Sequence, residues 1–268
     1  MKLARRPYPY RTSHALDELE LELAGGGVRT LLLKGVDPVA KPDFLQDPLR
    51  ELAAYRLLER HDLGTPVCYG LTQGGLLLEK VDGVELWQVG DLERWRDVLR
   101  WLARLHEAFA GGPEDGALLR HDLGFYERFA ERARAFGADV PPRHREVAEH
   151  LARLPRTLLH GDLYPSNVLV SDGRVCAVDW ELAAVGPAVM DVAAITSGWS
   201  ERDTASLVEA YLDARGATDR PSFLHDLDCA RLQLAVQWLG WSQGWRPPAE
   251  HAHDWRAELR AAAERLGL

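Results

Sequence analysis

The residues best placed to do chemistry form a short polar cluster between two apolar runs, in the segment LLHGDLYPSNVLV at 158–170. Asp162 and Asn167 stand in this cluster, and its two flanks read as strands. Asp179 follows twelve residues after Asn167, inside VCAVDWE, at the end of another short apolar run. The order His-x-Asp-x-x-x-x-Asn has the spacing of a phosphoryl-transfer catalytic loop, with Gly161 in a position that usually holds arginine.

Each residue type suits one part of moving a phosphoryl group to a hydroxyl. A carboxylate such as Asp162 can accept a hydrogen bond from the attacking hydroxyl and take its proton. The amide oxygen of Asn167 and the carboxylate of Asp179 are oxygen ligands of the kind that Mg²⁺ prefers. Lys34 would place a point charge on the α and β phosphates of a nucleotide, and Glu51 would pair with Lys34 and hold it extended.

Two of these residues are exceptions to the composition of the chain. Of 32 basic residues only Lys2, Lys34, Lys41 and Lys80 are lysine, and Asn167 is the sole asparagine. A strong preference for arginine with almost no asparagine is typical of a GC-rich genome. The presence of Lys34 and Asn167 against that bias indicates that these two positions need those side chains.

The first part of the chain reads as strands around one helix. The segment 15–23 alternates apolar and acidic residues, AGGG supplies a turn, and 28–36 reads as an antiparallel partner that carries the lysine. Asp47 as an N-cap and Pro48 at the first helical position then predict a helix that runs until Gly64 and carries Glu51 near its start.

A boundary between two regions is expected where an apolar strand at 75–86 breaks into a glycine-containing turn. We place the nucleotide-binding region at 1–83 and a helical region with the catalytic loop and acceptor pocket at 84–268. The helical region opens with an amphipathic helix at 91–112, capped by Asp91. Further helical patterns cover roughly 120–136, 143–153, 201–214, 222–245 and 250–266.

The run LLHGDLYPSNVLVSDGRVCAVDWELAAVGPAVMDVAA, residues 158–194, resembles the signature region of the aminoglycoside phosphotransferase and choline kinase family. This family is the small-molecule branch of the protein-kinase fold. The resemblance implies a two-lobed α+β fold, with a small antiparallel-sheet N-lobe and a larger, mainly helical C-lobe. Carried over by residue, it implies that Asp162 is the catalytic base and that Asn167 and Asp179 bind magnesium.

The same resemblance implies a nucleotide site between the lobes, with ATP as the expected donor and GTP as a possible one. Lys34 and Glu51 would form the phosphate-anchoring ion pair of that site. The backbone around Glu79 and Val81, in LLLEKVDG, would correspond to the hinge that holds adenine. Asp191 resembles a structural aspartate that braces the catalytic loop from behind.

One departure from the family pattern concerns the loop over the phosphates. No G-x-G-x-x-G precedes Lys34, and the only glycine cluster, Gly25 to Gly27, lies 7 to 9 residues upstream, where a turn between strands is expected. We therefore expect the phosphate-covering loop at YRTSHAL, where Thr12, Ser13 and backbone amides would contact phosphate.

Several other polar residues are interpreted as structural. His160 is expected to be a packed, hydrogen-bonded support, because the adjacent carboxylate fits the role of base better. The His-Asp pairs that begin at His61 and His121 are interpreted as surface residues, because they lack the further ligands of a metal-dependent phosphohydrolase. The segment HAHD at 251–254 reads as a solvated helix start rather than a metal site.

The acceptor is the part of the function that the sequence defines least. The formal charge is −1 over 1–83 and −8 over 84–268, which slightly favours a cationic or amino-bearing alcohol over a neutral one. Trp238, Trp241 and Trp245 recur on one helix. We expect them to pack in the core, with an aromatic cage for an ammonium group as the alternative.

Composition narrows the partners and the location. A net charge of −9 disfavours nucleic acid, and no apolar run is long enough to span a membrane. The three cysteines are odd in number and follow no secreted-scaffold spacing. We expect a cytoplasmic monomer whose partner is a small hydroxylated molecule.

These observations predict an ATP- and Mg²⁺-dependent kinase of a small molecule, aminoglycoside-like, choline-like or of another kind. A nucleotide-binding scaffold without turnover is the alternative, and it would be marked by loss of the base or of a metal ligand, neither of which is lost. A protein kinase is less favoured, because GPAVMDVAA follows Asp179 within a few residues and leaves little room for an activation loop closed by A-P-E.

Overall fold

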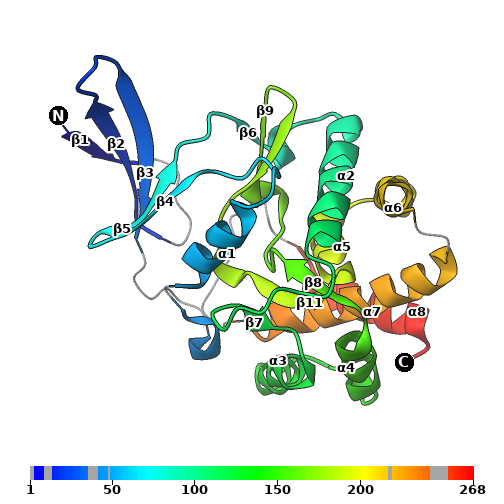
Figure 1. The fold of residues 1–268 in the computed structure, drawn as a ribbon. Coiled ribbons are helices and arrows are strands. Elements are labelled where there is room, and N and C mark those ends of the chain that lie inside the picture. Colours follow the sequence, from blue (N-terminus) through cyan, green and yellow to red (C-terminus); the bar gives the residue numbers. More distant parts are fainter. Residues whose placement is uncertain (1–2, 9–13, 36–41, 48, 217–218, 242–252) are drawn as a thin grey trace.

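The computed structural model describes residues 3–8, 14–35, 42–47, 49–216, 219–241 and 253–268. The chain begins with a five-stranded antiparallel sheet in the order β1-β2-β3-β5-β4, and helix α1 (Arg50–Leu58) lies between this sheet and the later part of the chain (Figure 1). The strands are β1 Leu3–Pro7, β2 Leu16–Glu22, β3 Val28–Lys34, β4 Cys68–Thr72 and β5 Gly75–Glu79.

The predicted strand pair is present as β2 and β3, in a register that sets Leu16 opposite Lys34. Leucines at alternate positions of these strands form a small buried cluster, Leu19 with Leu31 and Leu33, as the period of two requires. Lys34 is the last residue of β3 and points into the protein, with 6% of its surface exposed. Strand β1, which pairs with β2 at the edge of the sheet, was not predicted from the sequence.

Helix α1 differs from the prediction at both ends. The sequence places its first residue at Pro48, which lies outside the described residues, whereas α1 begins at Arg50 with Leu49 as its N-cap residue. The Asp47 carboxylate accepts a hydrogen bond from the Leu49 N–H at 2.9 Å, so it forms a local turn before the helix instead of capping it. The chain has left the helix before Gly64, which adopts a left-handed φ of 72°.

The later part of the chain is mainly helical, with two three-stranded sheets of order β10-β9-β6 and β7-β11-β8. Its helices are α2 Leu92–Ala108, α3 Leu123–Ala135, α4 His144–Arg153, α5 Val189–Ile195, α6 Glu201–Arg215, α7 Arg220–Leu239 and α8 Trp255–Leu266. Its strands are β6 Val84–Glu85, β7 Leu119–Arg120, β8 Arg156–Leu159, β9 Val168–Ser171, β10 Arg174–Ala177 and β11 Ala184–Pro187. The predicted α+β organisation, an antiparallel sheet followed by a largely helical region, is confirmed.

The helices follow the predicted apolar stripes closely. Asp91 caps α2 by accepting a hydrogen bond from the Glu93 N–H at 3.0 Å, and the inward face of α2 is buried in the main core. Helix α7 ends at Leu239 instead of 245, and the short helix α5 was not predicted. Asp254 caps α8, in agreement with the helix start expected there. Within the described ranges, no helix is long and apolar enough to cross a membrane.

Candidate active site

The polar cluster of the sequence forms the loop between β8 and β9. Asn167 ends a short 3-10 turn (Pro165–Asn167), and its Nδ2 donates to the main-chain oxygen and to Oδ2 of Asp162, at 2.8 and 2.9 Å. The Val178 N–H donates to the main-chain oxygen of Asn167 at 2.9 Å, which connects this loop to the end of β10. The loop therefore fixes the Asp162 carboxylate and keeps Oδ1 of Asn167 without a donor among the described residues.

Gly161 explains why this loop has no arginine before the aspartate. Its φ is 80°, in the left-handed region that favours glycine. A Cβ built at this position would lie 2.1 Å from the main-chain oxygen of Leu182, which belongs to the segment that follows Asp179. Two chain segments of the candidate site thus pass so close to each other that no side chain fits between them.

Replacement of Gly161 by alanine should therefore be strongly destabilising. We expect Gly161→Ala to lower the free energy of unfolding by about 2–4 kcal/mol, through the left-handed conformation and the overlap with Leu182 together. Gly137 is a matched control, because its φ is 78° and a Cβ there meets no atom within 4 Å. Urea unfolding should show a much smaller loss for Gly137→Ala, and equal losses would contradict the steric argument.

His160 and Asp191 support the loop from the protein interior. The Asp191 carboxylate accepts hydrogen bonds from the N–H groups of His160 and Gly161, at 2.7 and 3.0 Å, and lies 3.5 Å from His106 Nε2. Burial would raise the pKa of Asp191, but the hydrogen bond and charge of His106, with His160, outweigh it and hold this pKa below its ordinary value. A carboxylate that accepts two backbone N–H groups fixes the backbone that carries Asp162.

The His160 ring is fully buried and is hydrogen-bonded at both nitrogens. Nε2 lies 2.9 Å from the Val178 main-chain oxygen, and the Asp162 N–H donates to Nδ1 at 3.3 Å. These partners assign the proton to Nε2. Burial lowers the pKa of His160, so the ring stays neutral and serves as a packed support for the loop.

Lys34 connects the five-stranded sheet to the rest of the candidate site. Its Nζ lies 2.7 Å from Oε2 of Glu51 on α1 and 2.5 Å from Oδ1 of Asp179. Burial lowers the pKa of Lys34, but the Asp179 and Glu51 carboxylates outweigh it and raise this pKa above its ordinary value. The ammonium therefore stays charged. Asp179, the second residue after β10, adopts a left-handed backbone conformation with φ 64° and ψ 60°.

The Asp162 carboxyl has an altered proton affinity. Burial, with the nearby carboxylates of Asp179 and Glu181, raises the pKa of Asp162 to about 7, although the Asn167 hydrogen bond acts in the opposite direction. A carboxyl that titrates near neutral pH is suited to proton transfer in either direction. The position of the group and its pKa therefore both fit a general base.

Only some of the other residues predicted to contact the nucleotide belong to the described part of the chain. Thr12 and Ser13 lie outside the described residues. Glu79 ends β5, and its N–H and carboxylate are both hydrogen-bonded to the backbone of Val67, at 2.8 and 2.9 Å. Val81 lies two residues after the end of β5, outside any helix or strand, and no other described residue forms a backbone hydrogen bond with it.

A narrow pocket opens beside Asp162. Aromatic rings from α3, from the loop between β8 and β9, and from the end of α7 and the residues just after it line the pocket: Phe125, Phe129, Tyr164, Trp238 and Trp241. The pocket volume is about 30 Å³, which is room for little more than water, so an acceptor would enter only with movement of the walls. Asp162 is the only charged side chain among the described residues of this lining.

The interpretation of two sequence features changes at this pocket. His121 was expected at the surface, but it is 4% exposed, stacks on Phe125 with ring centroids 4.2 Å apart and lines the pocket. Burial lowers the pKa of His121 to about 4, so the ring is neutral at neutral pH. Trp238 and Trp241 pack against the core and also face the pocket, whereas Trp245 lies outside the described residues.

Arg50 is a contributor that the sequence did not reveal. Its buried guanidinium donates to the main-chain oxygens of Leu45, Ala117 and Glu181, at 2.6, 3.1 and 3.0 Å. These bonds hold α1, and with it Glu51, against the segment that follows Asp179. This role carries no sequence signal, because two of the three carbonyl partners, those of Ala117 and Glu181, are distant in the chain.

Comparison with known proteins agrees with this architecture. Solved structures of kinases share the fold: Plasmodium vivax ethanolamine kinase has a TM-score of 0.68 at 15% identity, over 97% of this chain and 82% of that one. Streptococcus pneumoniae choline kinase LicA gives 0.67 at 16%, over 100% and 94%. Brachybacterium faecium macrolide 2'-phosphotransferase MphH gives 0.60 at 18%, over 88% and 85%. The fold is therefore that of the kinase-like phosphotransferases.

The family follows from the sequence match. Residues 21–225 match the phosphotransferase enzyme family, and the chain belongs to that family. No curated protein sequence matches the chain significantly. A second structure of LicA, in complex with AMP, aligns with a TM-score of 0.65 at 14% identity, over 99% of this chain and 92% of that one.

Proposed function

We propose that the protein transfers the γ-phosphoryl group of ATP, or of GTP, to a hydroxyl of a small molecule. The observation that carries the proposal is the contact of the buried Lys34 ammonium with both Glu51 and Asp179, beside a loop in which Asn167 fixes Asp162. The AMP complex of LicA, a structural relative, supports a nucleotide as the donor.

The side chains divide the reaction among them. Lys34 would bind the α and β phosphates, and the backbone around Glu79 and Val81 would receive the adenine base. Thr12 and Ser13 are proposed to contact the phosphates. Asp162 would take the proton of the acceptor hydroxyl while the hydroxyl oxygen bonds to the γ-phosphorus, and the bond from that phosphorus to the leaving nucleoside diphosphate breaks.

The donor atoms also fit a divalent cation. Asn167 offers Oδ1 and Asp179 offers Oδ2, and no described residue donates a hydrogen bond to either oxygen. Such an amide and carboxylate pair suits Mg²⁺, which when bound would neutralise charge on the transferred phosphoryl group. We propose these two residues as the magnesium ligands.

The acceptor is proposed to be an alcohol with a largely apolar body and at most one positive charge. Five Phe, Tyr and Trp rings line the pocket, and they can receive either an apolar face or a single quaternary ammonium group, the latter by cation–π contacts worth ~0.5–2 kcal/mol. The one lining carboxylate, Asp162, is the proposed base. A polycationic aminoglycoside has several ammonium groups and finds no matching set of carboxylates among the described lining residues.

A panel of alcohols assayed for ADP release tests this proposal. We expect turnover with neutral apolar alcohols or with monocationic, choline-like alcohols, and much weaker turnover with polycationic aminoglycosides. A choline-like substrate should bind through the rings, so Trp241→Leu should raise its KM with little change in kcat. An aminoglycoside as the best substrate would contradict the acceptor class, and no turnover or nucleotide binding under any condition would contradict the kinase.

The alternative of a protein kinase finds no support in the segment after Asp179. Strand β11 begins at Ala184 and helix α5 at Val189, so the chain has no length for an activation loop. The scaffold alternative is disfavoured because the candidate base and both candidate metal ligands are present and held in place.

A further inference from the structure

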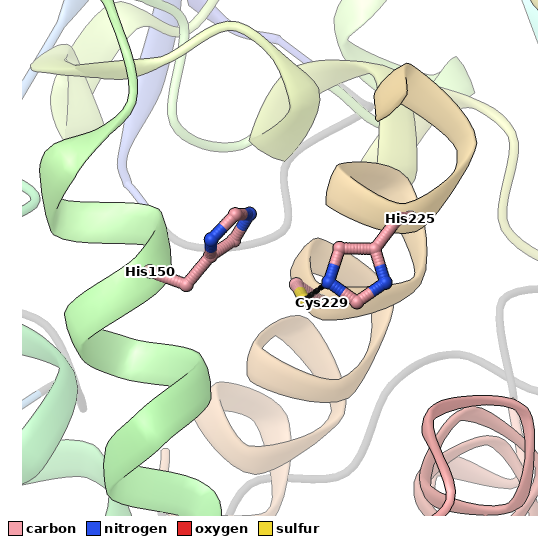
Figure 2. Close-up of side chains that lie close together, drawn as sticks. All are labelled: His150, His225 and Cys229. Carbon is pink, nitrogen blue, oxygen red and sulfur yellow. Dashed lines mark hydrogen bonds between the residues drawn. The ribbon is translucent and has the colours of Figure 1, made fainter. Parts of the chain in front are cut away.

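A second cluster of chemically capable side chains lies away from the catalytic loop, between helices α4 and α7. His150 comes from α4, and His225 and Cys229 come from α7 (Figure 2). One ligand atom of each side chain lies within 4.8 Å of the other two. Cys229 is buried, His150 is partly buried and His225 is exposed, so the cluster opens to solvent on one side.

The spacing of the two residues on α7 brings them to one face of the helix. Residues four apart in an α-helix lie one above the other, and His225 Nε2 is 3.8 Å from Cys229 Sγ. Two ligands of a tetrahedral zinc ion are separated by roughly 3.5 Å, given bonds of about 2.0–2.3 Å. The pair therefore needs little rearrangement to hold one ion. His150 approaches from the neighbouring helix, and the centroids of the His150 and His225 rings lie 5.3 Å apart.

Asp226 adds a carboxylate at the edge of the cluster. Its Oδ1 lies 2.6 Å from His150 Nε2, and carboxylates commonly orient metal-ligating histidines in this way. A metal ion on this ring can take Nδ1 and leave that hydrogen bond in place, or take Nε2 and bring the carboxylate in as a ligand. Two imidazoles and a thiolate prefer Zn²⁺ over the hard cations Mg²⁺ and Ca²⁺.

We propose that His150, His225 and Cys229 form a zinc-binding site that joins α4 to α7. The fourth position would hold water or the Asp226 carboxylate. Trp238, in the lining of the acceptor pocket, lies nine residues beyond Cys229 on the same helix, which is about 13 Å at the helical rise. The ion would therefore fix the first half of the helix whose second half borders the acceptor.

Cobalt substitution tests the site without any requirement for turnover. Titration of the metal-free full-length protein with Co²⁺ should give the visible bands of tetrahedral cobalt and a sulfur-to-cobalt charge-transfer band, saturating at one equivalent. Excess Zn²⁺ should abolish these bands, and excess Mg²⁺ should not. Cys229→Ser should remove the charge-transfer band, whereas Cys68→Ser, a thiol on β4, should retain it.

A stability measurement gives a second readout. Because a ligand bound only by the folded state stabilises it, Zn²⁺ should raise the melting temperature of the wild-type protein. This increase should be lost in His225→Ala, whose exposed side chain can be removed without damage to the core. Asp226→Asn should lose a small part of the increase if the carboxylate only orients His150, and a larger part if the carboxylate is a ligand. Absence of the cobalt bands, or their persistence in Cys229→Ser, would overturn the proposal.

Discussion

Asp162→Asn should lower phosphoryl transfer by roughly 10²–10⁴-fold while nucleotide binding persists. The amide has the shape of the carboxylate but cannot accept the proton of the acceptor hydroxyl. It can still accept the Asn167 Nδ2 hydrogen bond that Oδ2 receives at 2.9 Å, so the loop should keep its conformation. Steady-state turnover, with nucleotide affinity measured separately, separates the loss of the base from a loss of binding.

The pH dependence of the wild-type rate provides a check on the same group. Asp162 has a pKa of about 7 in the protein alone, and only its deprotonated form can act as a base. The rate should therefore fall as the pH falls through this pKa, and a bound cation should move the fall to lower pH.

Asp172→Asn is the matched control for Asp162→Asn, because Asp172 lies in an exposed turn and its left-handed φ of 47° is one that asparagine tolerates. Wild-type turnover in Asp162→Asn would assign the base elsewhere.

Asp179→Asn should remove most of the magnesium-dependent nucleotide binding and reduce turnover by more than roughly 100-fold, because loss of a metal ligand should exceed the 10–100-fold loss typical of an outer-shell partner. Asparagine is preferable to alanine here, since the φ of 64° at this position suits asparagine. In the wild-type protein, ATP with Mg²⁺ should raise the melting temperature more than ATP with a chelator does.

The difference between those two melting shifts is the quantity to compare between variants. It should nearly vanish in Asp179→Asn and remain in Asp172→Asn. Loss of the shift with ATP in both the presence and the absence of Mg²⁺ would point instead to collapse of the Lys34 environment, because Asp179 also contacts that ammonium. A full magnesium-dependent shift in Asp179→Asn would exclude this residue as a ligand.

The sequence predicted those parts of the fold that depend on local pattern. Alternation of apolar and acidic residues defined β2, the apolar run after the AGGG turn defined β3 as its partner, and an N-terminal aspartate with an apolar stripe defined α2. The catalytic-loop spacing identified Asp162 and Asn167, which the structure places in direct contact. Pairing of Lys34 with Glu51 also follows from order along the chain, and their side chains lie 2.7 Å apart.

The remaining features depend on contacts between distant segments. His121 stacks on Phe125 only four residues later, but the backbone at Val185 and Gly186 also packs against it, so a surface position was the reasonable but wrong expectation. The requirement for glycine at 161 arises from the main-chain oxygen of Leu182, 21 residues later in numbering. Arg50 binds three carbonyls from separate parts of the chain. Periodicity and spacing contain no record of such tertiary contacts.

The Lys34 ammonium lies between the carboxylates of Glu51 and Asp179, and this position affects how a metal–nucleotide complex would bind. A divalent cation that binds Asp179 must take this carboxylate from the ammonium, which lies only 2.5 Å away. The phosphates that arrive with the cation offer the ammonium a replacement partner. The Lys34 ammonium and the Asp179 carboxylate both keep a partner of opposite charge only when both ions enter together, so we expect free Mg²⁺ and free nucleotide each to compete poorly with the ion pair. Metal and nucleotide would then bind with mutual positive cooperativity, and the preformed complex would be the true substrate.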